Sequence, residues 1–350
     1  MNDYPEVAVV ILNWNGRRHL ETYLPSVFAT IHNSWRLVVI DNASTDDSVE
    51  FMRQKYADKL EIVVLKENYG YAGGYNQGLK QIPAKFYVLL NSDIEVTPNW
   101  LDRPVELMKI KNIAAVQPKI RSWKEREKFE YAGAAGGYID RWGYPFCAGR
   151  LFQDLETDLG QYDYEKDVFW VSGACMFVRA DVFWKVSGLD EDYFAHMEEI
   201  DLCWRLQNAG FRLIQTHLST VYHLGGGSLA YGNPRKTFLN FRNSLITVQK
   251  NLPVLSATIV ILVRLILDLP AALLFLARGS SADFKAVADA HFAFYKMQKD
   301  IRSKRKLIGA KKGRHHYKTI YAGSVVLDYF LKGKKRLPGF VSTNHARDLS

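Results

Sequence analysis

The chain has 350 residues, 48% of them hydrophobic, and a formal net charge of +9. This length allows one large or two smaller domains, and the composition is normal for a globular protein with a sizeable core. The three cysteines, Cys147, Cys175 and Cys203, form no C-x-x-C pair, which argues against a disulfide framework or zinc cage and favours a reducing compartment. The first residues, MNDYPEV, lack the basic and apolar regions of a secretory signal.

The positive charge is concentrated near the C-terminus. Between Lys296 and Arg336 there are fourteen Lys or Arg and two acids, so this segment carries about +12 and the remainder about −3. A basic tail of this kind predicts an anionic partner or surface, and a membrane is one such surface. No recognised nucleic-acid-binding fold accompanies it, so we expect no nucleic-acid partner.

Short apolar runs alternate with helical segments over the first hundred residues. Buried strands are expected at 7–12, 37–40, 61–65 and 86–90, and a helix at 17–30. This alternation predicts an α/β fold with a mostly parallel sheet flanked by helices. Neither G-x-G-x-x-G nor a P-loop motif follows the first strand, which excludes a dinucleotide-binding Rossmann fold and a P-loop fold.

The run at 86–90 stops abruptly at Asn91, Ser92 and Asp93. Open α/β sheets bind ligands beyond the carboxyl ends of their strands, and a carboxylate there can hold a divalent cation that in turn holds a diphosphate. The alternative is a simple strand-to-turn transition in which Asp93 caps the next segment. Asp41 ends the second strand, so both acids should lie at the same edge of the sheet.

The segment 68–78, NYGYAGGYNQG, contains four glycines in eleven residues. It predicts a loop that leads into a helix, allows close backbone approach to a ligand and turns helix N-terminal amides toward phosphate; an ordinary flexible loop is the alternative. A second long stretch, 121–161, is expected to be an irregular binding loop.

A helix from residue 198 begins with three acids. Asp201 is explained by a surface ion pair with Arg205 four residues later, which leaves Glu198 and Glu199 unexplained. The helix dipole alone favours acids at this end, but a carboxylate at the lip of a pocket is also a candidate general base. A strand is expected at 169–179.

A further pair of strands, 212–216 and one at Val221, is expected to lead into His223 and a Gly-Gly-Gly-Ser run at 225–228. A lone histidine is usually structural. The glycines imply close approach to another group, and an imidazole nitrogen would complete the metal coordination begun by Asp93.

Together these motifs resemble the family 2 glycosyltransferases with the GT-A fold, most closely their rhamnosyl- and galactofuranosyltransferase-like branch. The resemblance spans about 7–251. The motifs that carry it are VAVVILNWNG, VVIDNASTDDS, ENYGYAGGYNQG, LLNSDIEV, WVSGACMFVR, GLDEDYFAHMEEIDLCWR, VYHLGGGS and FRNSLITVQKN.

The resemblance implies a set of site residues. Asn91 and Asp93 stand where the family has D-x-D, so Asp93, with His223, would bind Mg²⁺ or Mn²⁺. Glu199, beside Glu198, stands at the position of the catalytic base. The remaining candidates fall into two groups: nucleotide-binding residues Asn13, Asp41, Asn68, Gly70, Gly74, Asn76 and Ser92, and acceptor-side residues Trp170, Ser172 and Gly173. Asn91 and Glu199 both replace an aspartate of the family pattern, which lowers the charge of the metal site and lengthens the base.

The implied activity is inverting, metal-dependent hexosyl or rhamnosyl transfer. The donor would be a UDP-, dTDP- or GDP-sugar, and the acceptor a hydroxyl of a glycan or lipid-linked molecule in cell-surface polysaccharide synthesis. A sugar-nucleotide-binding scaffold and a pyrophosphorylase-like nucleotidyltransferase are the alternatives. Against the second, NWNGRRH stands where such enzymes carry a Gly-rich loop with Arg and Lys.

The expected domains are a catalytic domain, 1–251, with a nucleotide half to about 120 and an acceptor half beyond, and a helical, basic, membrane-associating region, 252–350. The stretch 252–277 is apolar except for Arg264 and Asp268, and its uncharged pieces of twelve and nine residues are too short to span a bilayer. We expect a monotopic or re-entrant hairpin at the cytoplasmic face of the inner membrane. The alternatives are a buried helix pair, an interface of a homo-oligomer and a true transmembrane span.

Overall fold

The computed structural model describes residues 5–130, 132–225, 233–308, 317–346 and 349. Its centre is a mixed nine-stranded sheet with the order β11-β13-β6-β12-β4-β1-β2-β3, to which β5 adds by pairing with β13. β1 is parallel to β2 and β4, whereas β12 is antiparallel to β4. The strands are β1 Val7–Asn13, β2 Trp35–Asp41, β3 Glu61–Val64, β4 Phe86–Asn91, β5 Ile94–Val96, β6 Ile113–Ser122, β11 Lys166–Asp167, β12 Cys175–Arg179 and β13 Arg212–His223. The predicted α/β architecture is therefore confirmed.

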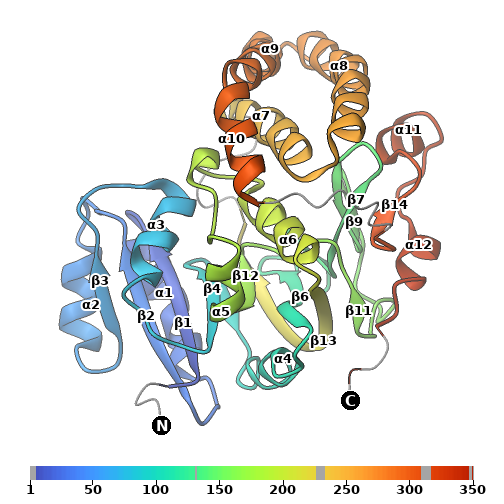
Figure 1. Cartoon of the computed structure of the whole chain (residues 1–350). Helices are drawn as coiled ribbons and strands as arrows, with labels where there is room; N and C mark the ends of the chain where they lie inside the picture. Colours follow the sequence, from blue (N-terminus) through green and yellow to red (C-terminus); the bar gives the residue numbers. More distant parts are fainter. Residues whose placement is uncertain (1–4, 131, 226–232, 309–316, 347–348, 350) are drawn as a thin grey trace.

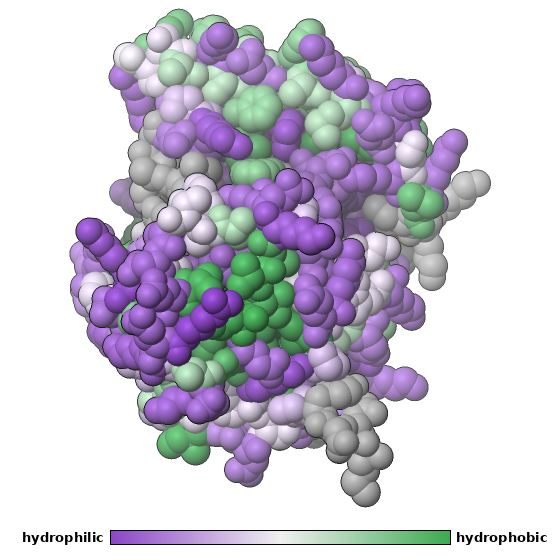
Figure 2. Space-filling view, turned by 90° about the vertical axis from the view of Figure 1, so that its left-hand side faces the viewer, coloured by the Kyte–Doolittle hydropathy of each residue, from purple (hydrophilic) through white to green (hydrophobic). Residues whose placement is uncertain are grey.

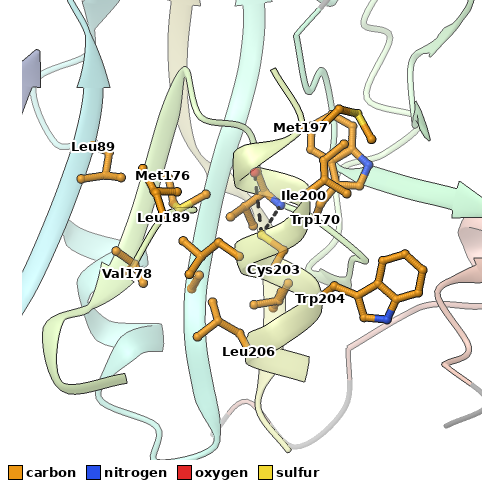
Figure 3. Close-up of a cluster of buried hydrophobic side chains, with 14 of the residues drawn as sticks. Leu89, Trp170, Met176, Val178, Leu189, Met197, Ile200, Cys203, Trp204 and Leu206 are labelled. Carbon is orange, nitrogen blue, oxygen red and sulfur yellow. Dashed lines mark hydrogen bonds between the residues drawn. The ribbon is translucent and has the colours of Figure 1, made fainter. Parts of the chain in front are cut away.

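Helices cover both faces of this sheet (Figure 1). They are α1 Arg17–Phe28, α2 Ser48–Tyr56, α3 Gly70–Leu79, α4 Asp102–Met108, α5 Ala180–Lys185 and α6 Glu198–Asn208. Alternate residues of β1 enter different cores: Ala8 and Val10 one, Val9 and Ile11 the other. Figure 3 shows one of these cores, where Ile200, Cys203 and Leu206 of α6 lie beside Met176 and Val178 of β12. Such two-sided burial explains the uninterrupted apolar runs of the central strands.

The glycine-rich segment forms helix α3 itself instead of the expected loop before a helix. A Cβ atom at Gly74 would stand 2.8 Å from Leu12 Cδ1, and one at Gly78 would stand 2.2 Å from Ile40 Cδ1. The glycines thus let α3 lie unusually close to β1 and β2. Tertiary packing of this kind overrides the low helix propensity of glycine.

Replacing Gly78 with Ala is expected to destabilise the fold by about 1–3 kcal/mol, because the new methyl group would overpack against Ile40. Urea unfolding of the two proteins measures the difference. Gly339→Ala in α12 is the matched control, because its Cβ would meet no atom within 4 Å. Equal stability of Gly78→Ala and wild type would contradict this account of α3.

Residues 121–161, expected to be irregular, contain most of a second sheet with the order β10-β9-β8-β7-β14. Its strands are β7 Gly137–Asp140, β8 Pro145–Cys147, β9 Arg150–Leu151, β10 Asp154–Leu155 and β14 Ile320–Tyr321. These strands are too short for their alternation to stand out in the sequence. Similarly, β13 is one strand with an irregularity between Gln215 and Thr220, where two strands were expected.

The chain beyond β13 forms a helical layer and then returns to the small sheet (Figure 1). Its helices are α7 Pro234–Asn251, α8 Val254–Ala277, α9 Ser281–Lys296, α10 Gln298–Ile308, α11 Val325–Phe330 and α12 Pro338–Ser342. β14 pairs with β7, so part of the segment after residue 251 packs against the part of the chain before it. The division into two domains at residue 251 stays a prediction. α8 is one continuous helix through Pro270, where a hairpin of two short pieces was one expectation, and by length and composition alone it is apolar enough to cross a membrane.

β3 forms one edge of the main sheet, and Figure 2 faces this side of the molecule, where apolar side chains gather near the middle. Val64 of β3 is 50% exposed, and Ile62 and Val63 are half-buried. The strand has only four residues, and exposed Glu61 and Lys66 stand at its ends. A short edge with charged ends resists pairing with the edge of another sheet.

Candidate active site

The parallel strands bring their polar ends together at one edge of the sheet, as predicted. Asn13 pairs in register with Asp41, and Leu12 with Asn91. Asn13 Nδ2 donates to Asp41 Oδ1 at 3.0 Å, and the backbone N–H of Ser44 donates to Asp41 Oδ2 at 2.9 Å. The buried Asn13 Oδ1 has no hydrogen-bond partner among the described residues. This edge therefore offers a fixed carboxylate and an unused amide oxygen beside the strand ends.

Asn42, which the sequence did not single out, organises the start of α3. Its Nδ2 donates to Asn68 Oδ1 at 2.9 Å and to the Gly70 carbonyl at 3.0 Å, and its Oδ1 accepts from the Tyr69 N–H. Asn68 Oδ1 also accepts from the Gly70 N–H. Asn68 and Gly70 thus lie next to the Asp41 edge, and Gly70 has the positive φ of +70° that its turn requires.

Two predicted nucleotide-binding residues make close contacts within the protein. Gly74 packs against Leu12 and lies beside Asn42 Nδ2. Asn76 is buried: its Nδ2 donates to the Leu189 carbonyl and to Glu191 Oε1, and its Oδ1 accepts from the Leu189 N–H. Asn76 therefore joins α3 to the turn at 188–191. Because its amide is already engaged in these hydrogen bonds, Asn76 is not available to bind a nucleotide.

The two predicted metal ligands lie together. The short strand β5 runs antiparallel to β13 and pairs Ile94 with His223, which brings His223 Nε2 to 3.2 Å from Asp93 Oδ1. Both side chains are buried, while Asn91 and Ser92 are half-buried beside them. A carboxylate oxygen and an imidazole nitrogen this close are spaced as two ligands of one cation would be.

Glu130 completes this cluster and was not predicted. Its Oε2 lies 3.1 Å from His223 Nδ1, close enough to form an ion pair with the imidazole on the side away from Asp93. Burial alone would lower the pKa of His223, but Asp93 and Glu130 raise this pKa to about 10. Burial would raise the pKa of Asp93, but His223 holds it below its usual value. Residues 226–232, which include Gly226, Gly227 and Ser228 of the predicted motif, lie outside the described residues.

The acceptor-side residues form a turn between this cluster and α6. The Ala174 carbonyl accepts from the Asn91 N–H at 2.9 Å, and the Gly173 carbonyl accepts from the Tyr71 hydroxyl at 2.7 Å. The side chains of Trp170 and Ser172 are engaged within the protein: the indole donates to the Tyr138 carbonyl and the hydroxyl to the Ala132 carbonyl. Figure 3 shows Trp170 beside Met197, at the start of α6. These residues would shape the acceptor side as its wall.

Glu199 lies beside this turn. A Cβ atom at Gly173 would stand 3.7 Å from Glu199 Cβ, an ordinary contact, and 2.9 Å from the Tyr71 hydroxyl, which is the close contact that requires glycine at this position. Glu199 is half-buried and Glu198 is buried, with 5% exposed. Oε2 of each has no hydrogen-bond partner among the residues that the structure describes. An unpaired buried carboxylate oxygen is unfavourable in a purely structural role, which supports a functional one.

The two glutamates differ in their electrostatics. Burial raises the pKa of Glu199 from 4.5 to about 7, although backbone N–H groups at the helix start oppose this rise. Burial, and then the charge of Glu199, raise the pKa of Glu198 well above its usual value. Glu199 is therefore the accessible member, and its pKa lies where a general base at neutral pH is effective.

Asp201 forms a buried ion pair in place of the expected surface pair. Its side chain is fully buried, and its Oδ2 lies 2.8 Å from Arg205 Nη2 and 2.8 Å from Lys250 Nζ. Asn251 Nδ2 also donates to Asp201 Oδ1 at 2.8 Å. The i, i+4 spacing predicted the partner correctly, but α7 covers the pair.

The described part of the chain contains no group of three His, Cys, Asp or Glu side chains arranged to share one ion. Asp93 and His223 would thus supply two ligands. Mg²⁺ and Mn²⁺ suit such a set, because hard cations of this kind commonly take their remaining ligands from substrate phosphates and water. The residues present fit the predicted metal, whose binding would displace the proton that His223 holds between Asp93 and Glu130.

Comparison with known proteins agrees with this geometry. Residues 8–187, about half of the chain, match the model of glycosyl transferase family 2. An N-acetylglucosaminyl-diphospho-decaprenol L-rhamnosyltransferase of Mycobacterium tuberculosis is 25% identical over 238 residues, which are 62% of this chain and 75% of the relative. The O-antigen biosynthesis protein RfbC of Myxococcus xanthus is 25% identical over 223 residues, which are 63% of this chain but only 17% of the relative.

Among solved structures, a mannosyltransferase of Pyrobaculum calidifontis in complex with GDP-Man and Mn²⁺ superposes with a TM-score of 0.53. The two are 15% identical in sequence, and the match covers 88% of this chain and 86% of that one. This likeness shows a shared fold, the GT-A type. The chain belongs to family 2 of the glycosyltransferases.

Proposed function

We propose that this glycosyltransferase transfers a sugar with inversion, using Glu199 as the base and a divalent cation at Asp93 and His223. One arrangement carries the proposal: Glu199 lies beside Gly173, with its Cβ at contact distance. The next residue, Ala174, is hydrogen-bonded to Asn91 at the strand end that leads to Asp93. A base and a diphosphate site on the two sides of one short turn suit a displacement at a carbon held between them.

The reaction balances as a single displacement. Glu199 accepts the proton of the acceptor hydroxyl while that oxygen forms a bond to the anomeric carbon of the donor. The bond from this carbon to the phosphate oxygen breaks, and the nucleoside diphosphate leaves with the electron pair. Because attack and departure occur on opposite faces of the carbon, the anomeric configuration inverts.

Asp93 and His223 would hold Mg²⁺ or Mn²⁺, which when bound offsets the negative charge of the diphosphate leaving group. Glu130 keeps the His223 imidazole in place through Nδ1. Asn13, Asp41 and Asn68 at the same sheet edge would contact the nucleoside.

The donor would be a UDP-, dTDP- or GDP-sugar, and the acceptor a hydroxyl of a glycan or lipid-linked molecule in cell-surface polysaccharide synthesis. The names of the mycobacterial and Myxococcus relatives favour such an acceptor. Incubating the protein with each class of donor, Mn²⁺ or Mg²⁺ and a lipid-linked acceptor tests the proposal. Nucleoside diphosphate release is the expected result; release of pyrophosphate or of no nucleotide from any donor would contradict it.

We also propose that the protein binds a membrane surface through helix α8, at the cytoplasmic face of the inner membrane. Its two charged residues, Arg264 and Asp268, point inward: they pair with each other, Arg264 donates to Ser244 Oγ, and Tyr144 and His291 bond Asp268. Apart from Ser256 and Thr258 in its first turns, the exposed face is apolar. Its most exposed apolar members include Val254, Leu255, Ile259, Leu262, Ile266, Leu269 and Leu273. The inward charges tie α8 to its neighbours, so it would lie along one leaflet, with exposed Lys299, Arg302 and Lys306 of α10 available to lipid phosphates.

The triple variant Leu262→Ser, Ile266→Ser and Leu269→Ser is expected to lower binding to vesicles of phosphatidylethanolamine and phosphatidylglycerol at least 10-fold. Burying each such side chain in lipid is worth about 1.5–3 kcal/mol. Co-flotation with the vesicles measures the effect. Leu159→Ser, at a loop residue that is 84% exposed, is the control. Equal flotation of wild type and triple variant would place the protein's membrane contact elsewhere.

A further inference from the structure

Helix α7 carries a stripe of buried polar side chains that the proposed chemistry does not use. Asn243, Thr247, Lys250 and Asn251 are exposed by only 0%, 1%, 1% and 4%. Their spacing places them on one face of the helix. Buried polar groups are costly unless they are hydrogen-bonded, so the stripe needs partners of matching polarity. Those partners lie in and just before α6, the helix that begins with Glu198 and Glu199.

Asn243 holds the loop that leads into α6. Its Nδ2 lies 3.1 Å from the Tyr193 carbonyl, 2.9 Å from that of Ala195 and 2.7 Å from that of His196. The neighbouring Arg242 adds hydrogen bonds from Nη2 to the carbonyls of Asp192 and Tyr193. Two adjacent residues of α7 therefore bind the backbone directly ahead of the two glutamates.

Three residues of this loop have backbone conformations that are unfavourable on their own. Phe194, His196 and Met197 have φ values of 62°, 68° and 73°, all in the region that disfavours residues with side chains. Such conformations persist only where their surroundings enforce them, and they gather at functional sites. Within one residue of the last of them, α6 begins with Glu198.

The same face of α7 also binds α6 on the C-terminal side of Glu198 and Glu199. Lys250 Nζ and Asn251 Nδ2 each lie 2.8 Å from an oxygen of Asp201, two residues beyond Glu199. Thr247 Oγ1 lies 2.8 Å from the Tyr193 hydroxyl. Glu199 therefore stands between two anchors on one rigid helix.

We infer that Asn243 is a positioning residue that fixes the first turn of α6 and so sets where the Glu199 carboxylate meets the acceptor. The inference rests on the proposed role of Glu199 as base. Asn243 itself is buried under the loop and acts through the backbone of residues 193–196. Removing its amide would leave three carbonyls without this donor and release the left-handed residues, so the carboxylate would shift while the donor site at the strand ends stays in place.

Asn243→Ala is expected to lower kcat for sugar transfer about 100-fold, the loss associated with a misplacement of about 1 Å, and to leave the Kd of the donor within twofold. The pH dependence of kcat provides a readout that a loss of packing alone would not move. In wild type, kcat should decline on the acidic side of the profile with a midpoint near pH 7, because burial raises the pKa of Glu199 to about 7. In Asn243→Ala, where water reaches the Glu199 carboxylate, the midpoint of this acidic limb should move toward the ordinary value of 4.5.

Two controls separate positioning from stability. Asn240→Ala changes an exposed asparagine of the same helix and should match wild type. Leu245→Ala removes a buried apolar side chain of α7, so it should lower Tm and leave the acidic limb in place. If Asn243→Ala does not fold, the half-buried Arg242→Ala should lower kcat with the same shift of the limb, by a smaller amount.

An Asn243→Ala protein, or Arg242→Ala in its place, with wild-type kcat and an unmoved acidic limb would overturn the inference. That outcome differs from failure of the proposed function, in which wild type releases no nucleoside diphosphate or Glu199→Gln keeps full activity.

Discussion

Replacing Glu199 with Gln is expected to lower kcat for sugar transfer by about 10²–10⁴-fold, the usual contribution of a general base. Glutamine keeps the shape of the side chain beside Gly173 but cannot accept the acceptor's proton. Because the proposed donor site lies across the turn at 172–174, the Kd of the nucleotide-sugar with metal present should stay within a few-fold of wild type. Initial-rate kinetics and calorimetric titration of the donor measure the two quantities.

Glu50→Gln, the same chemical change on the exposed face of α2, should behave as wild type. Full activity of Glu199→Gln would instead make Glu198 the base. The pH profile gives an independent check on wild type. A base acts when deprotonated, and burial raises the pKa of Glu199 to about 7, so kcat should fall about tenfold per pH unit below that value.

The central relation of the site was predictable from sequence because it depends on strand ends. Parallel strands with buried faces must open at one edge, so Asp41 and Asp93 were expected at that edge, where the register of β1 with β2 and β4 brings their strand ends together. His223 is 130 positions from Asp93, and the polar motif around it suggested a ligand. The pairing that brings the two together, between the three-residue β5 and the end of β13, carries no signal of its own in the sequence.

Residues set by tertiary packing were missed or misplaced. Glu130 lies in a stretch that read as irregular, and only its position behind His223 gives it a role. Asn76 and Gly74 belong to a motif typical of a ligand-binding loop, yet the close approach that their helix makes is to β1 and the turn at 188–191. A period-3.6 pattern of polar residues at 243, 247, 250 and 251 was visible, but a polar stripe usually faces solvent. Its burial depends on Asp201 and the loop at 193–196, which lie about 50 positions earlier in the chain.

Asp93→Ala is expected to abolish metal-dependent binding of the nucleotide-sugar and to lower kcat/KM about 10²–10⁴-fold, in keeping with the several kcal/mol that a metal contributes at a charged leaving group. The variant removes the only carboxylate of the D-x-D position, because Asn91 supplies no charge. His223→Ala should weaken metal binding in the same direction and less strongly, since the carboxylate remains. Titration of Mn²⁺ with and without donor, followed by calorimetry, measures both effects.

His217→Ala serves as the control for this pair, because His217 is a half-buried histidine of the same strand, β13, that lies away from Asp93. Loss of metal binding in His223→Ala but not in His217→Ala would tie the effect to the 3.2 Å contact between His223 and Asp93. A metal titration that is unchanged in Asp93→Ala would remove that residue from the coordination sphere. The pair would then be a structural ion pair with Glu130, and the cation, if the reaction needs one, would have to be held by other groups.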